Sequence, residues 1–431
     1  MSSEAAVVLD DRDRQVVAHI VTRCVAGAGG VAVRGAVSLD RDRYRSILVT
    51  GTREGPLLDQ ARAHGIEVVV VPQLVSPISP VNDALALLRL VSVLKSRRVS
   101  VVHTHSAKAG ALGRIAARRA GVRTVVHTLH GFPFHDFQGR VTHTAYVGIE
   151  RWLGRRTDHL LAVGTAVAVE ALRRGLARPG QLHTIGPAVD PPSVVLTEQT
   201  RRAARELLGI APDTPVVGTV GRLDYQKAPE VMVGALERMR TPALLVWVGD
   251  GEQAAMVRDL VDARGLQDRV RLLGNRNDVP ALLPAFDVFA LSSRYEGLPC
   301  AIVEAQQCGI PVVATAVNAV ADVVVPGESG LLVPPQRPDL LADALDHALE
   351  HPELARRWAR VAREQLGSRY DPQTLGRVLD EVYAGPLSGS APEPVVTAPE
   401  PVVTAPEAVV TAPEPVATAP EPVGVLSRGG A

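Results

Sequence analysis

Cysteine, long apolar runs and net charge are all scarce in this 431-residue chain. Its three cysteines are too few and too widely spaced for a disulfide framework or a zinc site, which favours a reducing compartment. No window approaches the ~18 apolar residues that a membrane-spanning helix needs, and the acidic N-terminus has no apolar core of a signal peptide. We therefore expect a cytoplasmic protein, which could rest on the inner face of the plasma membrane.

The charges are balanced in number but unevenly distributed. Lys and Arg number 46, as do Asp and Glu. Residues 16–190 hold 23 Lys and Arg against 11 Asp and Glu, whereas the rest of the chain holds 23 against 35. A basic half suggests a partner such as an anionic membrane surface, although a general bias toward arginine would give the same numbers. We expect no nucleic-acid partner.

Short apolar runs alternate with helical patterns over most of the chain, which predicts βαβ units and parallel sheets. The length allows two such domains. We expect a disordered N-terminus (1–15), a first Rossmann-like domain (16–190), a second Rossmann-like domain (191–369) and a final helix (370–386). The predicted fold class is α/β, with two doubly wound sheets.

The last part of the chain has a different character. From residue 387 onward a heptapeptide of the type Ala-Pro-Glu-Pro-Val-Val-Thr recurs, with copies beginning at Ala391, Ala398, Ala405, Ala412 and Ala419. Proline excludes a coiled coil despite the seven-residue period. We predict a disordered tail over residues 387–431, either a spacer or docking segment or an inert low-complexity sequence.

Two glutamates stand out in Ser292–Thr315, which reads SSRYEGLPCAIVEAQQCGIPVVAT. Pro299 and Gly309 predict a helix between them, preceded by a loop that holds Glu296. Glu304 lies on this mostly apolar helix, where a carboxylate is costly unless it is paired or faces a polar ligand. A solvated strip on the helix surface is the plainer interpretation of Glu304.

Other polar groups follow predicted strands, where parallel sheets bind ligands. Arg222 and Lys227 lie in a strand-to-helix loop, in which a diphosphate would meet both charges and helix-start amides, although they could be ordinary solvated charges. The first half places His103, His105 and His130 after strands. Asp278 is expected to cap the helix that starts near residue 280.

A glycine-rich loop follows the first strand. Residues 27–32 match a loose dinucleotide fingerprint, but the second strand lacks the acidic residue that would hold a ribose, and no acid appears until Glu54. We therefore expect the backbone amides of Gly29 and Gly30 to face an interdomain cleft and meet a phosphate or an acceptor.

Four segments together resemble glycosyltransferase family 4, the retaining, nucleotide-sugar-dependent enzymes of the GT-B fold. They are the Glu-x7-Glu stretch 292–315, the Gly-Arg-Leu-x-x-x-Lys loop 221–227, and two first-half segments, 102–114 and 127–135. The first-half segments resemble the polysaccharide and lipid-linked-sugar branch. The sequence departs from the family at Gly164, where a serine is usual, and at Pro187, where a small polar residue is usual.

The resemblance implies an acceptor-side domain (16–190) and a nucleotide-sugar-binding domain (191–369) around a cleft, with the helix 370–386 closing back on the first domain. It also implies a retaining transfer of sugar from a nucleoside diphosphate sugar to a lipid-linked, polysaccharide or other hydroxyl acceptor, as in exopolysaccharide or cell-envelope synthesis. The implied diphosphate clamp is Gly221, Arg222 and Lys227. Glu296, with Gly297 and Leu298, would hold the donor sugar, and Glu304 the ribose. His130 would contact the sugar near the reacting carbon.

Some questions stay open at this point. A nucleotide-sugar epimerase of the same fold and a non-catalytic nucleotide-sugar-binding protein are the competing functions. No Asp-x-Asp metal motif stands at a suitable strand end, so we expect no metal and no cofactor beyond the donor substrate. A predicted helix over residues 146–156 carries Arg151, Trp152 and Arg155, and is either a surface helix with one packed tryptophan or a membrane contact.

Overall fold

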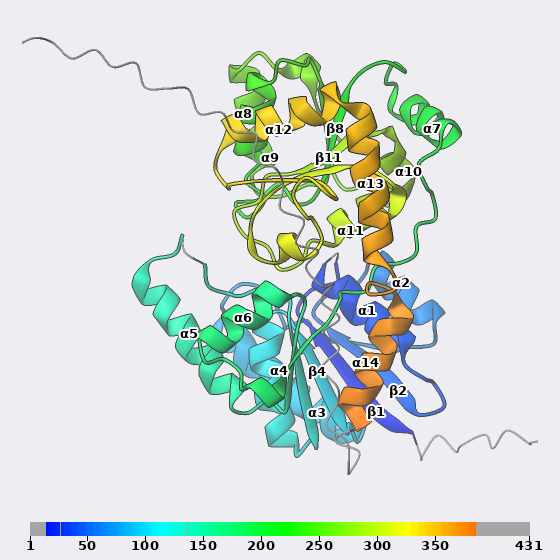
Figure 1. Ribbon diagram of the computed structural model, residues 1–431. Coiled ribbons are helices and arrows are strands. Elements are labelled where there is room, and N and C mark those ends of the chain that lie inside the picture. The colour runs from blue at the N-terminus through cyan, green and yellow to red at the C-terminus, as the bar shows by residue number, and fades with distance from the viewer. Residues whose placement is uncertain (1–13, 26, 136, 385–431) are drawn as a thin grey trace, which may run out of the picture. The chain divides into compact units, whose positions relative to one another are not determined.

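A computed structural model describes residues 14–25, 27–135 and 137–384 (Figure 1). Most of the predicted N-terminal segment and the whole repeat tail, 387–431, lie outside the described residues. Gln15, which we assigned to that N-terminal segment, begins the first strand.

The first sheet has seven parallel strands in the order β3-β2-β1-β4-β5-β6-β7. The strands are β1 (Gln15–Val21), β2 (Tyr44–Thr50), β3 (Glu67–Val70), β4 (Val101–His105), β5 (Thr124–Leu129), β6 (His159–Ala162) and β7 (Leu182–Thr184). The intervening helices are α1 (Ala28–Ser38), α2 (Pro56–Ala63), α3 (Pro80–Ser96), α4 (Ala107–Ala120), α5 (Arg140–Gly154), α6 (Thr165–Arg173) and the short η1 (Pro179–Gln181).

The second sheet has six parallel strands in the order β10-β9-β8-β11-β12-β13. They are β8 (Val216–Val220), β9 (Leu244–Val248), β10 (Val270–Leu272), β11 (Val288–Leu291), β12 (Val312–Thr315) and β13 (Leu331–Val333). Its helices are α7 (Glu198–Leu208), α8 (Pro229–Arg238), α9 (Ala254–Ala263), α10 (Val279–Leu282), α11 (Cys300–Cys308), α12 (Pro338–Glu350) and α13 (Pro352–Leu366), with 3-10 turns η2 (Gln267–Arg269), η3 (Leu283–Ala285) and η4 (Asn318–Asp322).

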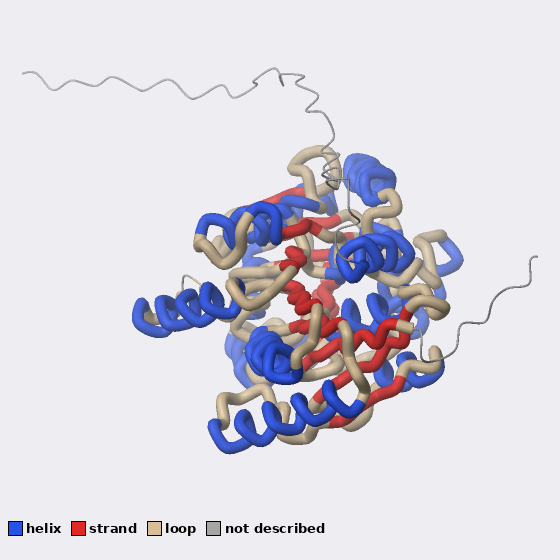
Figure 2. The backbone as a smooth tube through the Cα atoms, turned by 90° about the horizontal axis from the view of Figure 1, so that it is seen from below, coloured by secondary structure: helices blue, strands red, loops and turns tan. Residues whose placement is uncertain are grey.

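Both sheets are doubly wound, as predicted. Helices cover both faces of the strands (Figure 2), and most strand residues are therefore buried. The strand order reverses between β1 and β4 in one sheet and between β8 and β11 in the other. Ligands of such sheets bind outside the carboxyl ends of the strands at these reversal points.

The last described helix, α14 (Pro372–Ala384), returns to the first sheet and packs on α1 (Figure 1). A Cβ on Gly376 would lie 2.5 Å from the carbonyl oxygen of Ser38, so the two helices meet at a glycine. Asp380 accepts a hydrogen bond from the Tyr44 hydroxyl at 2.7 Å. Backbone proximity and this polar contact together tie α14 to α1 and β2.

Part of the recognised 102–114 segment serves packing. A Cβ on Gly110 would lie 2.6 Å from the His127 ring, and one on Gly113 would lie 2.6 Å from the Thr104 methyl group. Arg114 is buried and pairs with Glu150 of α5 at 2.8 Å. The two glycines thus let α4 pack closely on the sheet, and Arg114 connects α4 to α5.

Three local predictions differ from the structure. Helix α5 begins at Arg140, six residues before the predicted start. His103 and His105 lie inside β4 instead of following it. Asp278 stands at the start of α10 as expected, but its carboxylate bonds Arg276 at 2.5 and 2.7 Å and does not cap the helix. Among the described residues, no helix is long and apolar enough to cross a membrane.

Candidate active site

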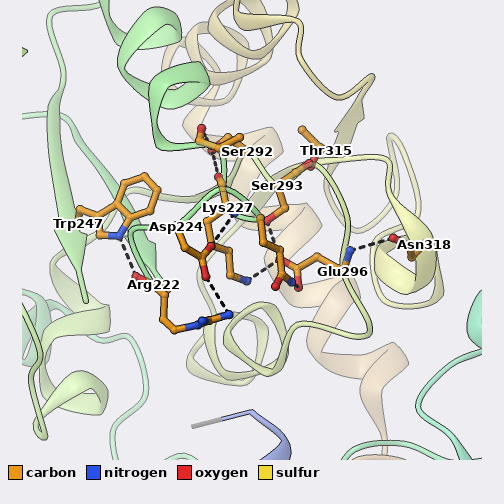
Figure 3. Close-up of polar contacts among 12 residues, drawn as sticks. Arg222, Asp224, Lys227, Trp247, Ser292, Ser293, Glu296, Thr315 and Asn318 are labelled. Carbon is orange, nitrogen blue, oxygen red and sulfur yellow. Dashed lines mark hydrogen bonds and ion pairs between the residues drawn. The ribbon is translucent and has the colours of Figure 1, made fainter. Parts of the chain in front are cut away.

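The loop after β8 is held in place from several directions (Figure 3). The indole nitrogen of Trp247 donates to the carbonyl oxygen of Gly221 at 2.9 Å. Asp224, which is buried, accepts from the backbone N–H of Lys227 at 3.1 Å and pairs with the half-exposed Arg222 at 2.8 Å. Arg222 and Lys227 are therefore carried by one structured turn at the carboxyl end of β8.

Lys227 meets Glu296 across the strand reversal (Figure 3). The ammonium nitrogen lies 2.5 Å from Glu296 Oε1, and the two side chains are 13% and 5% exposed. Ser293 donates to the same oxygen at 2.6 Å, and Gln226 donates to Oε2 at 3.0 Å. The backbone N–H of Glu296 donates to the Asn318 side chain at 2.8 Å. Two loops, after β8 and β11, thus converge on one buried carboxylate.

Backbone strain gathers in the same place. Ala228, directly after Lys227, has φ 48°, and Asn318 has φ 44°. Left-handed backbone is unfavourable for alanine and persists only where the surroundings impose it. The Ser292 hydroxyl donates to the carbonyl oxygens of Lys227 and Ala228 at 2.9 and 3.1 Å, which fixes this turn.

The loop after β5 reaches the same site from the first sheet. A Cβ on Gly297 would lie 1.8 Å from the carbonyl oxygen of His130, so only glycine allows this approach. His130 itself is half-buried and hydrogen-bonds His105 at 3.0 Å. The structure therefore brings His130, from one half, beside the residue that follows Glu296, from the other.

Three buried histidines of the first sheet, His19, His103 and His105, bring ring nitrogens within 4.8 Å of one another. This spacing alone would suit a metal ion. However, both nitrogens of His103 already have hydroxyl partners, Tyr383 at 2.5 Å and Thr128 at 2.7 Å. We therefore interpret the group as a hydrogen-bonded cluster.

Glu304 lies on α11 in a different environment from Glu296. Burial raises the pKa of its carboxyl group, and the nearby cation of Arg34 opposes this shift. Arg34 is itself buried, with its guanidinium bonded to the carbonyl oxygen of Ala188 at 2.7 Å and to Asp190 at 3.2 Å. The positive charge of a buried arginine from α1 thus acts on the α11 glutamate.

The glycine-rich loop has a structural explanation. A Cβ on Gly30 would lie 2.7 Å from the Arg34 guanidinium, and one on Gly29 would lie 3.0 Å from the backbone of Cys24. These glycines leave room for Arg34 and for the turn before α1, and whether their amides contact a ligand stays a prediction. Sequence reasoning missed Arg34, as well as Asp224, Gln226 and Asn318. Asp224 and Gln226 lie inside the recognised loop and could have been found there.

The family departure at Gly164 also has a structural counterpart. A Cβ there would lie 2.5 Å from the Ala319 side chain and 2.8 Å from the Asp322 carboxylate. Asp322 accepts a hydrogen bond from the backbone N–H of Thr165 at the start of α6. Helix N-termini favour negative charge, so this glycine lets the first-half helix bind a second-half carboxylate.

Comparison with known proteins decides the family. The profile described as "Glycosyl transferases group 1" matches residues 200–365, and that described as "Glycosyltransferase Family 4" matches residues 25–192. An Escherichia coli protein named UDP-Gal:alpha-D-GlcNAc-diphosphoundecaprenol alpha-1,3-galactosyltransferase is 32% identical over 312 residues, which cover 70% of this chain and 79% of that one. The chain belongs to glycosyltransferase family 4.

Further relatives agree with this assignment. The alpha-D-kanosaminyltransferase of Streptomyces kanamyceticus is 30% identical over 296 residues, covering 65% of this chain and 76% of that one. The crystal structure of Anabaena HepE in complex with UDP and glucose has a TM-score of 0.75 at 22% identity, and the match covers 86% of this chain and 100% of HepE. This family 4 chain is thus a glycosyltransferase with the GT-B fold.

Proposed function

We propose that this glycosyltransferase transfers a hexosyl group from a UDP-sugar to a lipid-linked acceptor at the site of Lys227, Glu296 and His130. The observation that carries the proposal is the buried Lys227–Glu296 pair at the strand reversal, with His130 beside Gly297. UDP is present in the HepE structure, and the E. coli relative is named for a UDP-galactose donor and a diphosphoundecaprenol acceptor.

The proposed chemistry begins with the leaving diphosphate. Cleavage of the anomeric C–O bond places negative charge on the diphosphate oxygens. Lys227 and Arg222 supply positive charge, and the amides at the start of α11 supply further donors. Glu296, fixed by Ser293 and Gln226, accepts from hydroxyl groups of the donor sugar. Glu304 binds the ribose hydroxyls, with Arg34 beside it to favour the ionised carboxylate.

We propose retention of configuration by same-face substitution. A double-displacement route needs a carboxylate that is free to attack the anomeric carbon. Glu296 is instead held by an ion pair with Lys227 and by hydrogen bonds from Ser293 and Gln226, which fix it as a hydrogen-bond acceptor and keep it from attacking. In the same-face route the departing phosphate oxygen takes the proton of the acceptor hydroxyl, while the acceptor oxygen forms the new bond to the anomeric carbon.

A donor panel tests this function. Purified protein is incubated with UDP-, GDP- and ADP-hexoses, with and without a polyprenyl-diphosphate-linked sugar, and nucleoside diphosphate release is measured. We expect release from a UDP-sugar only when the acceptor is present, and an axial linkage in the product by NMR. Conversion of the donor without acceptor would favour an epimerase, and binding without release would favour a non-catalytic protein.

We also propose that α5 rests on an anionic lipid surface. Val141, Ile149 and Trp152 recur on one helix face and are 85%, 49% and 42% exposed. The guanidinium of Arg156 lies 3.9 Å from the centre of the Trp152 ring. A pocket of about 410 Å³ beside the helix end is lined by Arg151, Arg155 and Arg178, among others. Exposed apolar groups bordered by arginines are typical of interfacial helices.

Vesicle sedimentation tests the membrane contact. The protein should bind vesicles that contain phosphatidylglycerol and not vesicles of phosphatidylcholine alone. Trp152→Ser should weaken this binding at least about tenfold, whereas Leu207→Ser, which removes a 56% exposed apolar side chain from α7, should not. Equal binding by both variants would refute a role for α5.

A further inference from the structure

Three histidines form a line of hydrogen bonds that leads from the candidate site into the first sheet. Nε2 of His130 lies 3.0 Å from Nδ1 of His105, and Nε2 of His105 lies 3.4 Å from Nδ1 of His19. His19 and His105 are fully buried, at 0% and 1% exposure. The line ends at Nε2 of His19, which is buried and has no hydrogen-bond partner.

A fourth histidine supports the line from the side. The ring of His103 lies 4.2 Å from that of His105 between centroids, and its two nitrogens bond the hydroxyl groups of Tyr383 and Thr128. Since both nitrogens of His103 bond hydroxyl groups, His103 makes no hydrogen bond to the three histidines of the line. It fixes the ring of His105, and through Tyr383 it connects the line to α14.

The direction of the protons along the line follows from the charge state. Burial lowers the pKa of His19 and His130 to about 3 and that of His105 well below its usual range, so all three rings are neutral at pH 7. A neutral ring has one N–H and one bare nitrogen. Each hydrogen bond along the line needs one N–H donor and one bare acceptor nitrogen. The N–H groups of the three rings must therefore all point toward His130 or all point toward His19.

We propose that the protons point toward His130, so that His130 presents Nδ1–H to the substrate. The opposite arrangement would leave the Nε2–H of His19 buried without an acceptor, and orphaned buried N–H groups are the rarest kind in proteins. In the proposed arrangement the bare Nε2 of His19 is the unpartnered atom. No described residue hydrogen-bonds Nδ1 of His130, which leaves it available to a ligand.

This arrangement defines what His130 does, and it rests on the proposed function in placing the donor sugar at His130. A neutral ring with Nδ1–H donates a hydrogen bond to a sugar oxygen and accepts no proton from it. His130 would thus stabilise charge near the anomeric carbon as a fixed donor and would not act as a base. His105 and His19 are positioning residues that act through it, because they set which nitrogen carries its proton.

Nitrogen NMR of histidine-labelled protein tests the proton positions directly, because protonated and bare ring nitrogens resonate in separate ranges. We expect His130 to show Nδ1–H and bare Nε2 in the wild-type protein, with its signals identified from His130→Gln. In His105→Leu, His130 should lose this preference and show Nε2–H. Finding Nε2–H on His130 in the wild type, or an unchanged tautomer in His105→Leu, would overturn the proposal.

Kinetics of transfer separate positioning from folding. His105→Leu should lower kcat about tenfold or more while the KM for the donor stays within about twofold, because the donor group of His130 acts in the transition state. His105→Asn, whose amide can still donate to His130 Nε2, should restore most of kcat and the wild-type tautomer. If His105→Asn is as impaired as His105→Leu although both are folded, the proposal is wrong.

A matched control and a separate outcome complete the test. His127 is equally buried in β5 and bonds the Thr104 hydroxyl at 2.9 Å, outside the line, so His127→Leu should leave the tautomer of His130 unchanged. A changed tautomer in this control would count against the assigned line. If the tautomers are as proposed but His130→Ala transfers at the wild-type rate, the role of His130 in catalysis fails while the line itself stands.

Discussion

Replacing Lys227 by methionine would test the electrostatic centre of the site. The change keeps most of the side-chain volume and removes an ammonium group 2.5 Å from Glu296. Because the two side chains are 13% and 5% exposed, water can replace little of the lost contact. Breaking a buried ion pair by removing one partner costs about 3–5 kcal/mol. Ser293 and Gln226 still donate to Glu296, so Lys227→Met should fall at the lower end, about 3 kcal/mol.

The reciprocal change and the double variant complete a cycle. Glu296→Gln leaves the Lys227 ammonium group without its carboxylate, so its cost should be similar. The double variant removes both charges and should be more stable than the sum of the single effects predicts, with a coupling energy of about 1–3 kcal/mol. Urea unfolding followed by circular dichroism measures the free energy of unfolding for all four proteins.

Transfer rates provide the second readout of the same cycle. Each single variant should lose about 100-fold to 1,000-fold in kcat, because Lys227→Met removes a prearranged donor and Glu296→Gln removes the carboxylate that holds this donor in place. The double variant should lose far less than the product of the two single effects. Lys95→Met, on the exposed side of α3, is the control and should change neither quantity. If each single variant loses less than about 0.5 kcal/mol in the free energy of unfolding, the pair behaves like a surface salt bridge, and the reasoning from its burial is wrong.

Three further predictions concern closure, pH and metal. Gly297→Ala should lower kcat about 100-fold, because the added Cβ would lie 1.8 Å from the His130 carbonyl oxygen. Gly148→Ala on α5 is the control and should transfer normally, because its added Cβ would meet no neighbouring atom within 4 Å. Equal rates in the two variants would contradict the contact between Gly297 and His130. Burial lowers the pKa of five histidines (His19, His103, His105, His127 and His130), so below pH 6.5 the unfolded chain binds protons that the folded chain does not. Stability should therefore fall as the pH drops from about 7 to 5.5, by about 1.3 kcal/mol for each such histidine in urea titrations, and a flat profile would contradict their neutrality. Because we propose that Lys227 and Arg222 supply the positive charge for the leaving diphosphate, transfer should survive excess EDTA. Complete loss of transfer that added Mg²⁺ restores would show that these two residues are insufficient.

The alternation of strands and helices could be predicted because local patterns encode it. Apolar runs and their boundaries placed the strands of both sheets except the short edge strand β7, and Gly309 ends α11 in a left-handed conformation, as its position predicted. The candidate residues Arg222 and Lys227 also came from a local pattern, since they share one loop, and their role in binding stays a prediction. A structural feature can be predicted from the sequence where the residues that determine it lie within the same short segment.

Features that depend on distant segments could not be predicted. His103 and His105 lie within β4 because that strand pairs along its whole length with β1, about 85 residues earlier in the chain. The early start of α5 was missed because Val141, Thr142 and Thr144 are poor helix formers, and its packing against α4 outweighs that preference. Arg34 has no motif around it, and only the folded chain brings it to Glu304.

The packing roles of three glycines could not be predicted either, because they depend on residues from distant segments of the chain. Gly110 and Gly113 belong to the segment that resembles the family, yet each one admits a side chain from a neighbouring strand. Gly297 admits a carbonyl group from the other half of the chain. A sequence pattern marks such positions as special without showing whether a ligand or the protein itself occupies the space.

The most direct test of the account is steady-state transfer by two variants from opposite halves of the chain. His130→Ala and Glu296→Gln are assayed with a UDP-hexose and a polyprenyl-diphosphate-linked acceptor, beside Glu328→Gln as an exposed control. If one site contains both residues, each variant should lose at least about 100-fold in kcat while the control transfers normally. Wild-type rates in either His130→Ala or Glu296→Gln would contradict the account.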